Sequence, residues 1–393
     1  MSAAMPPFTR IPLATPAPFR RRLDQLGLLV ANDEGLPYWE SQAAYQIGAQ
    51  PAAALLKAAE TLQALCRRAV ATIVDTQDFS PFAIESAAMQ AAITASWKAS
   101  EAPLYGRMDF SFAPDGTPKL LDYEADGPLG LPEASYLQWE WFEAFPAAEQ
   151  NGASQENLIY EKLLTQWPRL ELLPRAAIAC GGATTADGRP GDTAERFTAE
   201  YLAETAREAG VALGLCSIEA VGWDGDARAF TDEQDQPLAA LLKLYPWHWM
   251  EQEPNVETLG VNRTRLLPAA WTRLLADKAF LAVLWTMFPD CPYLLPSSLD
   301  AAAIAGDRVA KPCRGGDGEG ISLPNQSHES GAPLLFQQHC RLPFFHAHEG
   351  RAAYAALSVW MVGDAAAGLG FRESTGPITD AGHRFVPHIL RPA

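Results

Sequence analysis

Basic side chains are scarce in this sequence. Its 393 residues include 30 Lys and Arg against 47 Asp and Glu, which gives a formal net charge of −17. A surface that binds duplex nucleic acid needs clustered Lys and Arg to contact phosphates, so this balance argues against a nucleic-acid partner. An anionic ligand would therefore have to be held by a few well-placed cations.

Long apolar runs and paired cysteines are also absent. The longest apolar stretch, Ala279 to Phe288, is much shorter than the roughly 18 residues that a membrane span needs. Proline interrupts the N-terminal stretch, and no apolar run follows a basic start as it does in a secretory signal. The six cysteines form no C-x-x-C pair, which argues against a disulfide framework or a zinc site. We expect a cytoplasmic protein with no membrane partner.

Several familiar enzyme motifs are missing as well. The glycines after Cys180 match neither the G-x-G-x-x-G fingerprint nor the Walker phosphate loop. Asp192 and Glu195, which follow them, are explained by a capping box at the start of a helix. His346 and His348 lack a third nearby zinc ligand, and no G-x-S-x-G motif supports nucleophilic hydrolysis.

The composition is that of a globular protein, with 48% hydrophobic and 20% charged residues. Its length predicts two or three subdomains or one large composite unit. Apolar positions from Leu55 to Ile73 recur at helical spacing, which predicts a helix that begins near Pro51. Residues 171–245 alternate strand-like and helix-like segments and are expected to form an inserted α/β subdomain. The first twenty residues are expected to form an extended arm, and the fold class is α/β (α+β).

A β-hairpin is predicted over residues 107–124. Apolar residues alternate with polar ones along its first half, and P-D-G marks the turn. If the hairpin closes symmetrically about Asp115–Gly116, Asp109 lies opposite Asp122 and Arg107 lies opposite Glu124. A shift of one residue would place Asp122 and Glu124 on the apolar face, so the hydrophobic pattern favours the symmetric register.

This register brings like charges together across the hairpin, which is destabilising unless something offsets the repulsion. A raised pKa, the guanidinium group of Arg107 and a bound divalent cation are three possible compensations. Three carboxylates on one face are oxygen ligands that suit Mg²⁺ carried by a nucleotide. A solvated acidic face is the alternative, and the spacing alone does not decide between the two.

A second group of candidate residues lies in the segment VAKPCRGGDGEGISL. It places Lys311 at the end of a predicted strand, before a glycine-rich loop and a further strand. Such a loop can bring backbone N–H groups close to phosphates, with the lysine as a point charge. The alternative is a surface hairpin loop, which glycine-rich sequence also forms. Upstream, a helix is predicted from about Trp271 to Phe288.

Together these segments resemble the ATP-grasp ligase portion of the glutathionylspermidine synthase family. The resemblance runs through YWESQAAY, GRMDFSFAPDGTPKLLDYEAD, KLYPWHWM, LLADKAFLAVLWTMFPDCPYLLPSSLD, AKPCRGGDGEG, GLGFREST and RFVPHIL. It implies one ATP-grasp unit over residues 15–393, with an N-terminal helical region and a pre-ATP-grasp-like subdomain at 171–245. The nucleotide-binding region would be 265–393, with its lid at 311–321. We expect a stand-alone synthase-like member without an amidase domain.

The resemblance also implies roles for individual residues. Asp109, Asp122 and Glu124 match the metal ligands. Arg107 and Arg372 match catalytic arginines near the transferred phosphoryl group. The nucleotide-binding positions are Lys278, Lys311, the lid glycines Gly316 and Gly318, and Gln337 at the adenine hinge, for which Gln338 is the alternative.

The implied reaction is the ATP- and Mg²⁺-dependent joining of a small carboxylic acid to an amine through an acyl phosphate. The resemblance implies a peptide-like acid such as glutathione and an amine such as a polyamine, without identifying either. Three departures from the family pattern stand out: Glu124 replaces Asn, Gly316 replaces the lid Arg, and Gly127–Gly130 replaces a Ser/Thr-rich segment. Arg314 is the candidate replacement for the lid arginine. The departures leave a second reading open, a nucleotide-binding protein of the same fold without ligase activity.

Overall fold

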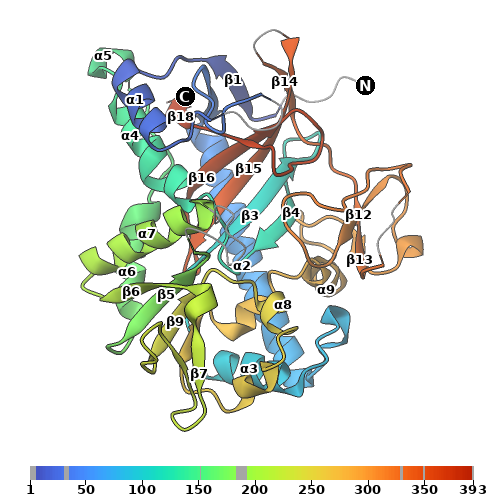
Figure 1. The fold of residues 1–393 in the computed structure, drawn as a ribbon. Coiled ribbons are helices and arrows are strands. Elements are labelled where there is room, and N and C mark those ends of the chain that lie inside the picture. The colour runs from blue at the N-terminus through green and yellow to red at the C-terminus, as the bar shows by residue number, and fades with distance from the viewer. Residues whose placement is uncertain are drawn as a thin grey trace.

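The computed structural model describes residues 6–30, 35–150, 152–182, 193–327, 331–347 and 350–391. Its centre is a six-stranded antiparallel sheet in the order β17-β16-β15-β3-β4, with β14 also paired to β15 (Figure 1). The strands are β3 (Tyr105–Phe112), β4 (Pro118–Glu124), β14 (Phe344–His346), β15 (Ala352–Val362), β16 (Ala365–Ser374) and β17 (Arg384–Val386). The α/β fold class is confirmed.

The two faces of the central sheet have different surroundings. On β15, Leu357 and Val359 belong to the apolar core that also contains the buried face of helix α2 (Ala49–Thr76). The intervening Ser358 and Trp360 point to the other face, as side chains alternate along a strand. Met108 and Phe110 on β3 follow the same rule and join the core with Leu357. The opposite face carries Ser358 and also a second apolar cluster that includes Trp360.

The predicted hairpin is β3–β4, and its register is confirmed at one end only. Arg107 pairs with Glu124, and Asp109 pairs with Asp122. Beyond Asp109 the symmetric register, which would place Phe110 opposite Leu121, is wrong, because a bulge brings Leu120 opposite Phe110. A β-bulge adds one residue to one strand and re-aims the side chains beside it. Leu120 is fully buried in the core, whereas Leu121 lines a cleft.

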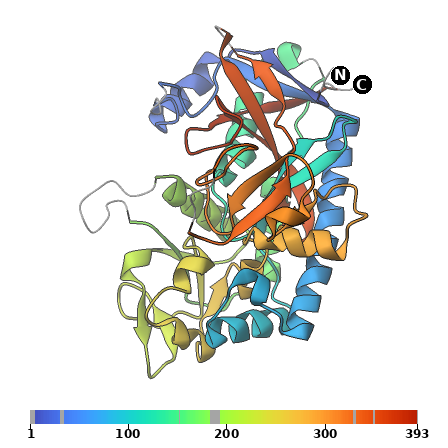
Figure 2. The same ribbon diagram turned by 90° about the vertical axis from the view of Figure 1, so that its right-hand side faces the viewer.

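A smaller antiparallel sheet lies beside the hairpin, in the order β11-β13-β12. Its strands are β11 (Ser297–Ser298), β12 (Arg308–Pro312) and β13 (Leu334–Gln338). Figure 2 views the molecule from this side, with the small sheet in front. The predicted strand after the glycine-rich loop is reduced to an isolated bridge between Ser322 and Ala310, on the edge of β12 opposite β13.

A parallel sheet in the order β10-β9-β5-β6 forms a separate layer. It comprises β5 (Ala176–Cys180), β6 (Leu213–Ser217), β9 (Ala240–Lys243) and β10 (Arg265–Leu267), and β7 (Gly222–Asp224) pairs with β8 (Ala229–Thr231) nearby. Helix α7 (Thr193–Glu208) contacts β5 and β6. The predicted α/β segment 171–245 therefore has a parallel sheet that takes a fourth strand from farther along the chain. Asp192, the predicted helix cap, lies outside the described residues.

The N-terminal region is not a simple extended arm. Strand β1 (Phe8–Pro12) pairs with β2 (Ala43–Gly48), which in turn pairs with β18 (His388–Arg391). The expectation of extended chain is wrong beyond Pro16, where helix α1 (Ala17–Gln25) begins. Pro18 sits in the first turn of that helix, where its missing N–H costs no hydrogen bond.

The remaining helices surround the sheets. They are α3 (Ala87–Lys98), a π-helical segment (Glu133–Leu137), α4 (Gln138–Glu143), α5 (Ala147–Gln150), α6 (Ile159–Arg169), α8 (Trp247–Met250) and α9 (Ala279–Met287). The predicted helix from Trp271 to Phe288 is divided, because a 3-10 turn over Ala270–Arg273 precedes α9. Further 3-10 turns are Ser80–Phe82, Ile218–Ala220, Val256–Gly260 and Ala301–Ala303. None of the helices in the described ranges has both the length and the apolar character to cross a bilayer.

Candidate active site

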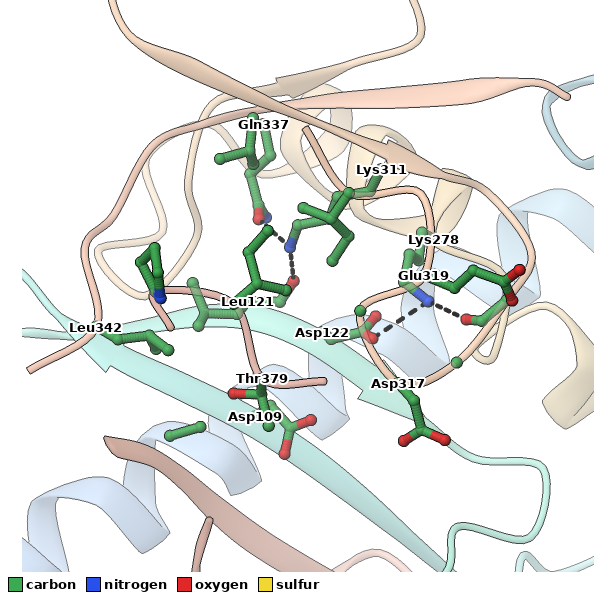
Figure 3. Close-up of a pocket in the computed structure, with 18 of the residues that line it drawn as sticks. Asp109, Leu121, Asp122, Lys278, Lys311, Asp317, Glu319, Gln337, Leu342 and Thr379 are labelled. Atoms are coloured by element: carbon green, nitrogen blue, oxygen red, sulfur yellow. Dashed lines mark hydrogen bonds and ion pairs between the residues drawn. The ribbon is translucent and has the colours of Figure 1, made fainter. Parts of the chain in front are cut away.

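A cleft lies between the polar face of β3–β4 and the small sheet, and it contains about 1040 Å³ of empty space. Figure 3 shows the side chains that converge on it. Every predicted site residue lines this cleft: Arg107, Asp109, Asp122, Glu124, Lys278, Lys311, Gly316, Gly318, Gln337 and Arg372. Gln338, the alternative hinge residue, lines it as well.

Asp109 is held by donors from three strands. Ser358 Oγ donates to its Oδ1 at 2.7 Å, Arg107 Nε donates to the same oxygen at 3.2 Å, and Arg372 Nη2 donates to its Oδ2 at 2.5 Å. Burial raises the pKa of Asp109, but Arg107 and Arg372 outweigh it and hold the pKa at about 2. Nε of Arg372 is buried and has no partner among the described residues, so this arginine can still donate to an anion.

Lys311 lies on the other side of the cleft. Its Nζ donates to Gln337 Oε1 at 2.8 Å and to the Leu121 carbonyl at 2.7 Å, as Figure 3 shows. The bulge in β4 therefore supplies a backbone acceptor to this lysine. Burial lowers the pKa of Lys311 to about 8. The side chain of Gln337 is committed to Lys311, whereas that of Gln338 is exposed in the same cleft.

Lys278 connects the hairpin with the glycine-rich loop. Its Nζ lies 3.3 Å from Asp122 Oδ2 and donates to the Gly315 carbonyl at 2.7 Å (Figure 3). Burial opposes the charge of Lys278, but Asp122 and Glu124 outweigh it and raise its pKa. Burial also raises the pKa of Glu124 to about 7, and the nearby carboxylate of Asp126 adds to the shift.

The carboxylates of the hairpin are oxygen ligands of the type that a nucleotide-bound Mg²⁺ takes, but they do not form a complete preformed metal site. Among the described residues, no three His, Cys, Asp or Glu side chains are close enough to hold a metal ion together. Mg²⁺ usually takes only one or two carboxylates and completes its shell with water and substrate phosphates. Asp122 and Glu124 suit that role best, because both oxygens of Asp109 already accept hydrogen bonds from protein donors.

The glycine-rich loop closes one end of the cleft. Gly318 has φ +70°, and a Cβ added there would lie 2.6 Å from the carbonyl oxygen of Thr379. Only glycine fits this close approach without strain. Gly316, in contrast, has open space around it. The loop carries acidic Asp317 and Glu319 toward the cleft, where the family pattern has an arginine.

Arg314 does not replace the missing lid arginine. Its guanidinium group donates to the Phe82 and Ala83 carbonyls and lies 3.5 Å from Asp277, away from the residues that line the cleft. The arginine instead anchors the start of the loop to the body of the protein.

A second cavity adjoins the first, and we call it the chamber. The two cavities share five lining residues, Arg107, Glu124, Gly316, Asp317 and Arg372. The rest of the chamber is lined mainly by aromatic, glycine and acidic residues, which include Tyr38, Asp126, Gly127, Gly130, Glu133, Trp249, Trp360, His383 and Phe385. Gly127–Gly130, where the sequence departs from the family pattern, thus borders the chamber rather than the cleft.

Several of these residues were not singled out from the sequence. Ser358 sits at an ordinary position of an apolar strand, and only the pairing of β15 with β3 places it opposite Asp109. Tyr38, Glu133 and His383 come from distant segments that meet at the chamber. In the sequence, only the position of Glu133 just after the carboxylate-rich hairpin indicates that it could belong to the site.

Comparisons with known proteins show which family the chain is similar to. The model of the family "Glutathionylspermidine synthase preATP-grasp" matches residues 10–391. A Haemophilus influenzae protein assigned as an acid–amine ligase is 28% identical over 379 residues, which cover 92% of this chain and 93% of the relative. The trypanothione synthetase of Crithidia fasciculata is 22% identical, and the match covers 72% of this chain and 47% of that protein.

Two further similarities are more distant. The bifunctional glutathionylspermidine synthetase/amidase of Escherichia coli is 22% identical over 250 residues, 57% of this chain and 38% of that enzyme. The chain thus spans less than half of the length of these two larger synthetases. A solved glutathione synthetase-like effector from Globodera pallida shares the fold, with a TM-score of 0.54, 9% identity and coverage of 95% of this chain and 96% of that one. The chain therefore belongs to the glutathionylspermidine synthase preATP-grasp family and is, like its named relatives, a ligase of the ATP-dependent, C–N bond-forming class.

Proposed function

We propose that this protein uses Mg²⁺-ATP to activate a small carboxylic acid as an acyl phosphate and then transfers the acyl group to an amine. The observation that carries the proposal is the junction of the two cavities at Arg107 and Arg372. The cleft has the lysines and glycine-rich loop that suit a nucleotide, and the chamber has room for the acid and the amine. Phosphoryl transfer between them would occur where the cations are concentrated.

In the first step, an oxygen of the substrate carboxylate attacks the γ-phosphorus of ATP, and the bond from that phosphorus to the β–γ bridging oxygen breaks. ADP leaves with the electron pair. Arg372 has a free Nε donor for the transferred group, and Lys278 and Lys311 are placed to neutralise the phosphates. Mg²⁺ would supply further positive charge at the phosphates, with Asp122 and Glu124 as the residues to hold it.

In the second step, the neutral amine nitrogen attacks the acyl carbon, and the bond from that carbon to the phosphate oxygen breaks. Inorganic phosphate leaves with the electron pair and takes up the proton that the nitrogen loses, so that an amide forms. Water would hydrolyse the acyl phosphate if it entered at this stage. The loop around Gly318, packed against Thr379, covers the cleft and restricts that access. Residues 265–393 would form the nucleotide-binding region, and 171–245 would belong to the subdomain that borders the chamber.

The relatives supply the first substrates to test. Their names include glutathionylspermidine, which joins glutathione to spermidine. We therefore propose a peptide-like carboxylic acid and a polyamine-like amine as the substrate classes.

Hydroxylamine trapping tests the first step without knowledge of the amine. The purified protein is incubated with Mg²⁺-ATP, hydroxylamine and a panel of peptide-like acids that includes glutathione. Acid-dependent hydroxamate and equimolar ADP are expected. ATP hydrolysis that no acid stimulates, with no hydroxamate from any member of the panel, would reject the proposal.

The acidic loop favours a second candidate, a nucleotide-binding protein without ligase activity. Asp317 and Glu319 face a cleft that would hold an anionic nucleotide, and Arg314 is turned away. Calorimetric binding of Mg²⁺-ATP together with no ADP release across the same panel would support this candidate. Formation of any hydroxamate would exclude it.

A further inference from the structure

Glu133 is a buried carboxylate that the reaction above does not use. It is the first residue of the π-helical segment Glu133–Leu137, and its side chain is only 3% exposed while it lines the chamber. Its Oε2 atom receives no hydrogen bond from any described residue. Buried polar atoms are nearly always paired, and π-helical turns occur often at functional sites. Glu133 Oε2 is therefore a buried acceptor whose hydrogen-bond donor is missing.

The protein groups around Glu133 do not supply the missing positive charge. Arg107 and Arg372 line the same chamber and both donate to Asp109, and the free Nε donor of Arg372 serves the transferred phosphoryl group in the reaction proposed above. Lys243 is ion-paired with Asp126 at 3.0 Å. Burial raises the pKa of Glu133 to about 7 and raises the pKa of the neighbouring Tyr38 hydroxyl, while the hydrogen bond from Tyr38 lowers the pKa of Glu133. A cation for Glu133 would have to enter with the ligand.

The chamber lining carries cationic and acidic groups together. At the junction with the nucleotide cleft it presents Arg107 and Arg372, which suit the carboxylate that is to be activated. Glu133 and Tyr38 line the same chamber, and Trp360 and Phe385 add apolar wall. An ammonium group has three donors and no acceptor, so it complements an unpaired carboxylate oxygen. The methylene groups of an aliphatic amine would suit the aromatic walls.

We propose, on the basis of the ligase function above, that Glu133 binds an ammonium group of the amine substrate other than the nitrogen that reacts, and thereby determines the preference for a cationic amine. Tyr38 positions the Glu133 carboxyl group for this contact. The acid and the nucleotide bind without using Glu133. Glu133 therefore acts in the recognition of the second substrate, whereas Arg372 acts in the activation of the first.

The experiment compares wild type with Glu133→Gln, which removes the charge but keeps the size. Glu143→Gln is the matched control, because it makes the same change at an exposed position of the adjoining helix α4. Binding of spermidine, n-butylammonium and its neutral analogue n-butanol is measured in the presence of Mg²⁺-ADP. Hydroxamate formation is measured in parallel for each variant with the acid that wild type uses.

We expect the two ammonium probes to bind Glu133→Gln more weakly by about tenfold or more, the size of effect for a lost hydrogen bond to a charged group. Butanol should not distinguish the variants, and Glu143→Gln should behave as wild type. Hydroxamate formation by Glu133→Gln should remain within about twofold of wild type, which shows that the fold and the activation step are intact. Glu133→Asp should recover part of the ammonium affinity, because it restores the charge.

Equal binding of the ammonium probes by wild type and Glu133→Gln would overturn the inference. Loss of hydroxamate formation in the variant would overturn it as well, since Glu133 would then act in activation or folding. Failure of the ligase proposal has a different signature, because wild type itself would then form no hydroxamate. The two failures are therefore distinguishable in one set of assays.

Discussion

Asp109 and Arg372 lie on strands that do not pair with each other, yet their side chains meet at 2.5 Å. Both strands flank β15, and the contact is made across that strand, next to Ser358. The Asp109 carboxylate thus accepts hydrogen bonds from Arg107, Ser358 and Arg372 at the junction of the two cavities. We infer that the main role of Asp109 is to hold the side chains of Arg107 and Arg372 in position.

Replacement of Asp109 by Asn should reduce acid-dependent hydroxamate formation by about 100-fold, the loss expected when catalytic groups move by about 1 Å. The amide would keep the shape but leave two buried arginines without their counter-charge. ADP and hydroxamate are measured together at saturating ATP. Asp75→Asn, an exposed change of the same kind, is the control. Full turnover by the Asp109 variant would contradict the assignment.

Lys311 should contribute mainly to nucleotide affinity. Its Nζ is held by Gln337 and the Leu121 carbonyl inside the cleft, so it is positioned before any ligand binds. Lys311→Met should weaken Mg²⁺-ADP binding by about tenfold to 100-fold, because a charge-assisted contact to phosphate is lost. Calorimetry provides the measurement, with exposed Lys57→Met as the control. An unchanged affinity would remove Lys311 from the nucleotide site.

Two glycines of the loop should respond differently to alanine. Gly318→Ala places a Cβ 2.6 Å from the Thr379 carbonyl oxygen, in a left-handed conformation that costs a non-glycine residue about 1–2 kcal/mol. The loop must then move, so we expect water to reach the acyl phosphate and the ratio of ADP to hydroxamate to rise. Gly316→Ala meets no neighbour and should keep the ratio of wild type. Similar ratios in the two variants would show that the loop does not exclude water.

His388 should make the protein less stable in mild acid. It is fully buried, its Nε2 accepts a hydrogen bond from the Glu156 N–H, and Gln138 Oε1 lies 2.9 Å from its Nδ1. Burial lowers its pKa from 6.5 to about 3. Between these values the unfolded chain binds a proton that the folded chain does not. The free energy of unfolding should therefore fall as the pH falls, by about 1.4 kcal/mol per pH unit from this group.

The midpoint of thermal unfolding, measured from pH 7 down to pH 4, checks this prediction. In His388→Gln the decline with acidity should be shallower, although the variant should be less stable at pH 7. The exposed His346→Gln should keep the slope of wild type. If wild type and His388→Gln decline in parallel, the histidine is not the group responsible.

The sequence by itself determined the hairpin, its turn and the pairing of Asp109 with Asp122. These depend on alternation along the chain and on the P-D-G turn, which are local properties. Through its resemblance to the family motifs, the sequence also identified ten candidate site residues, and all ten line the cleft. That the residues act as proposed is a prediction for the experiments above.

Only the tertiary structure decided which contacts those residues make and which cavities they line. The bulge that turns Leu121 toward Lys311 breaks the symmetric register, because packing of Leu120 in the core outweighs regular pairing. The contact between Arg372 and Asp109 arises because β15 separates their strands. The chamber and its unpaired Glu133 are assembled from segments far apart in the chain, and no pattern within one segment reports which distant groups will remain without a partner.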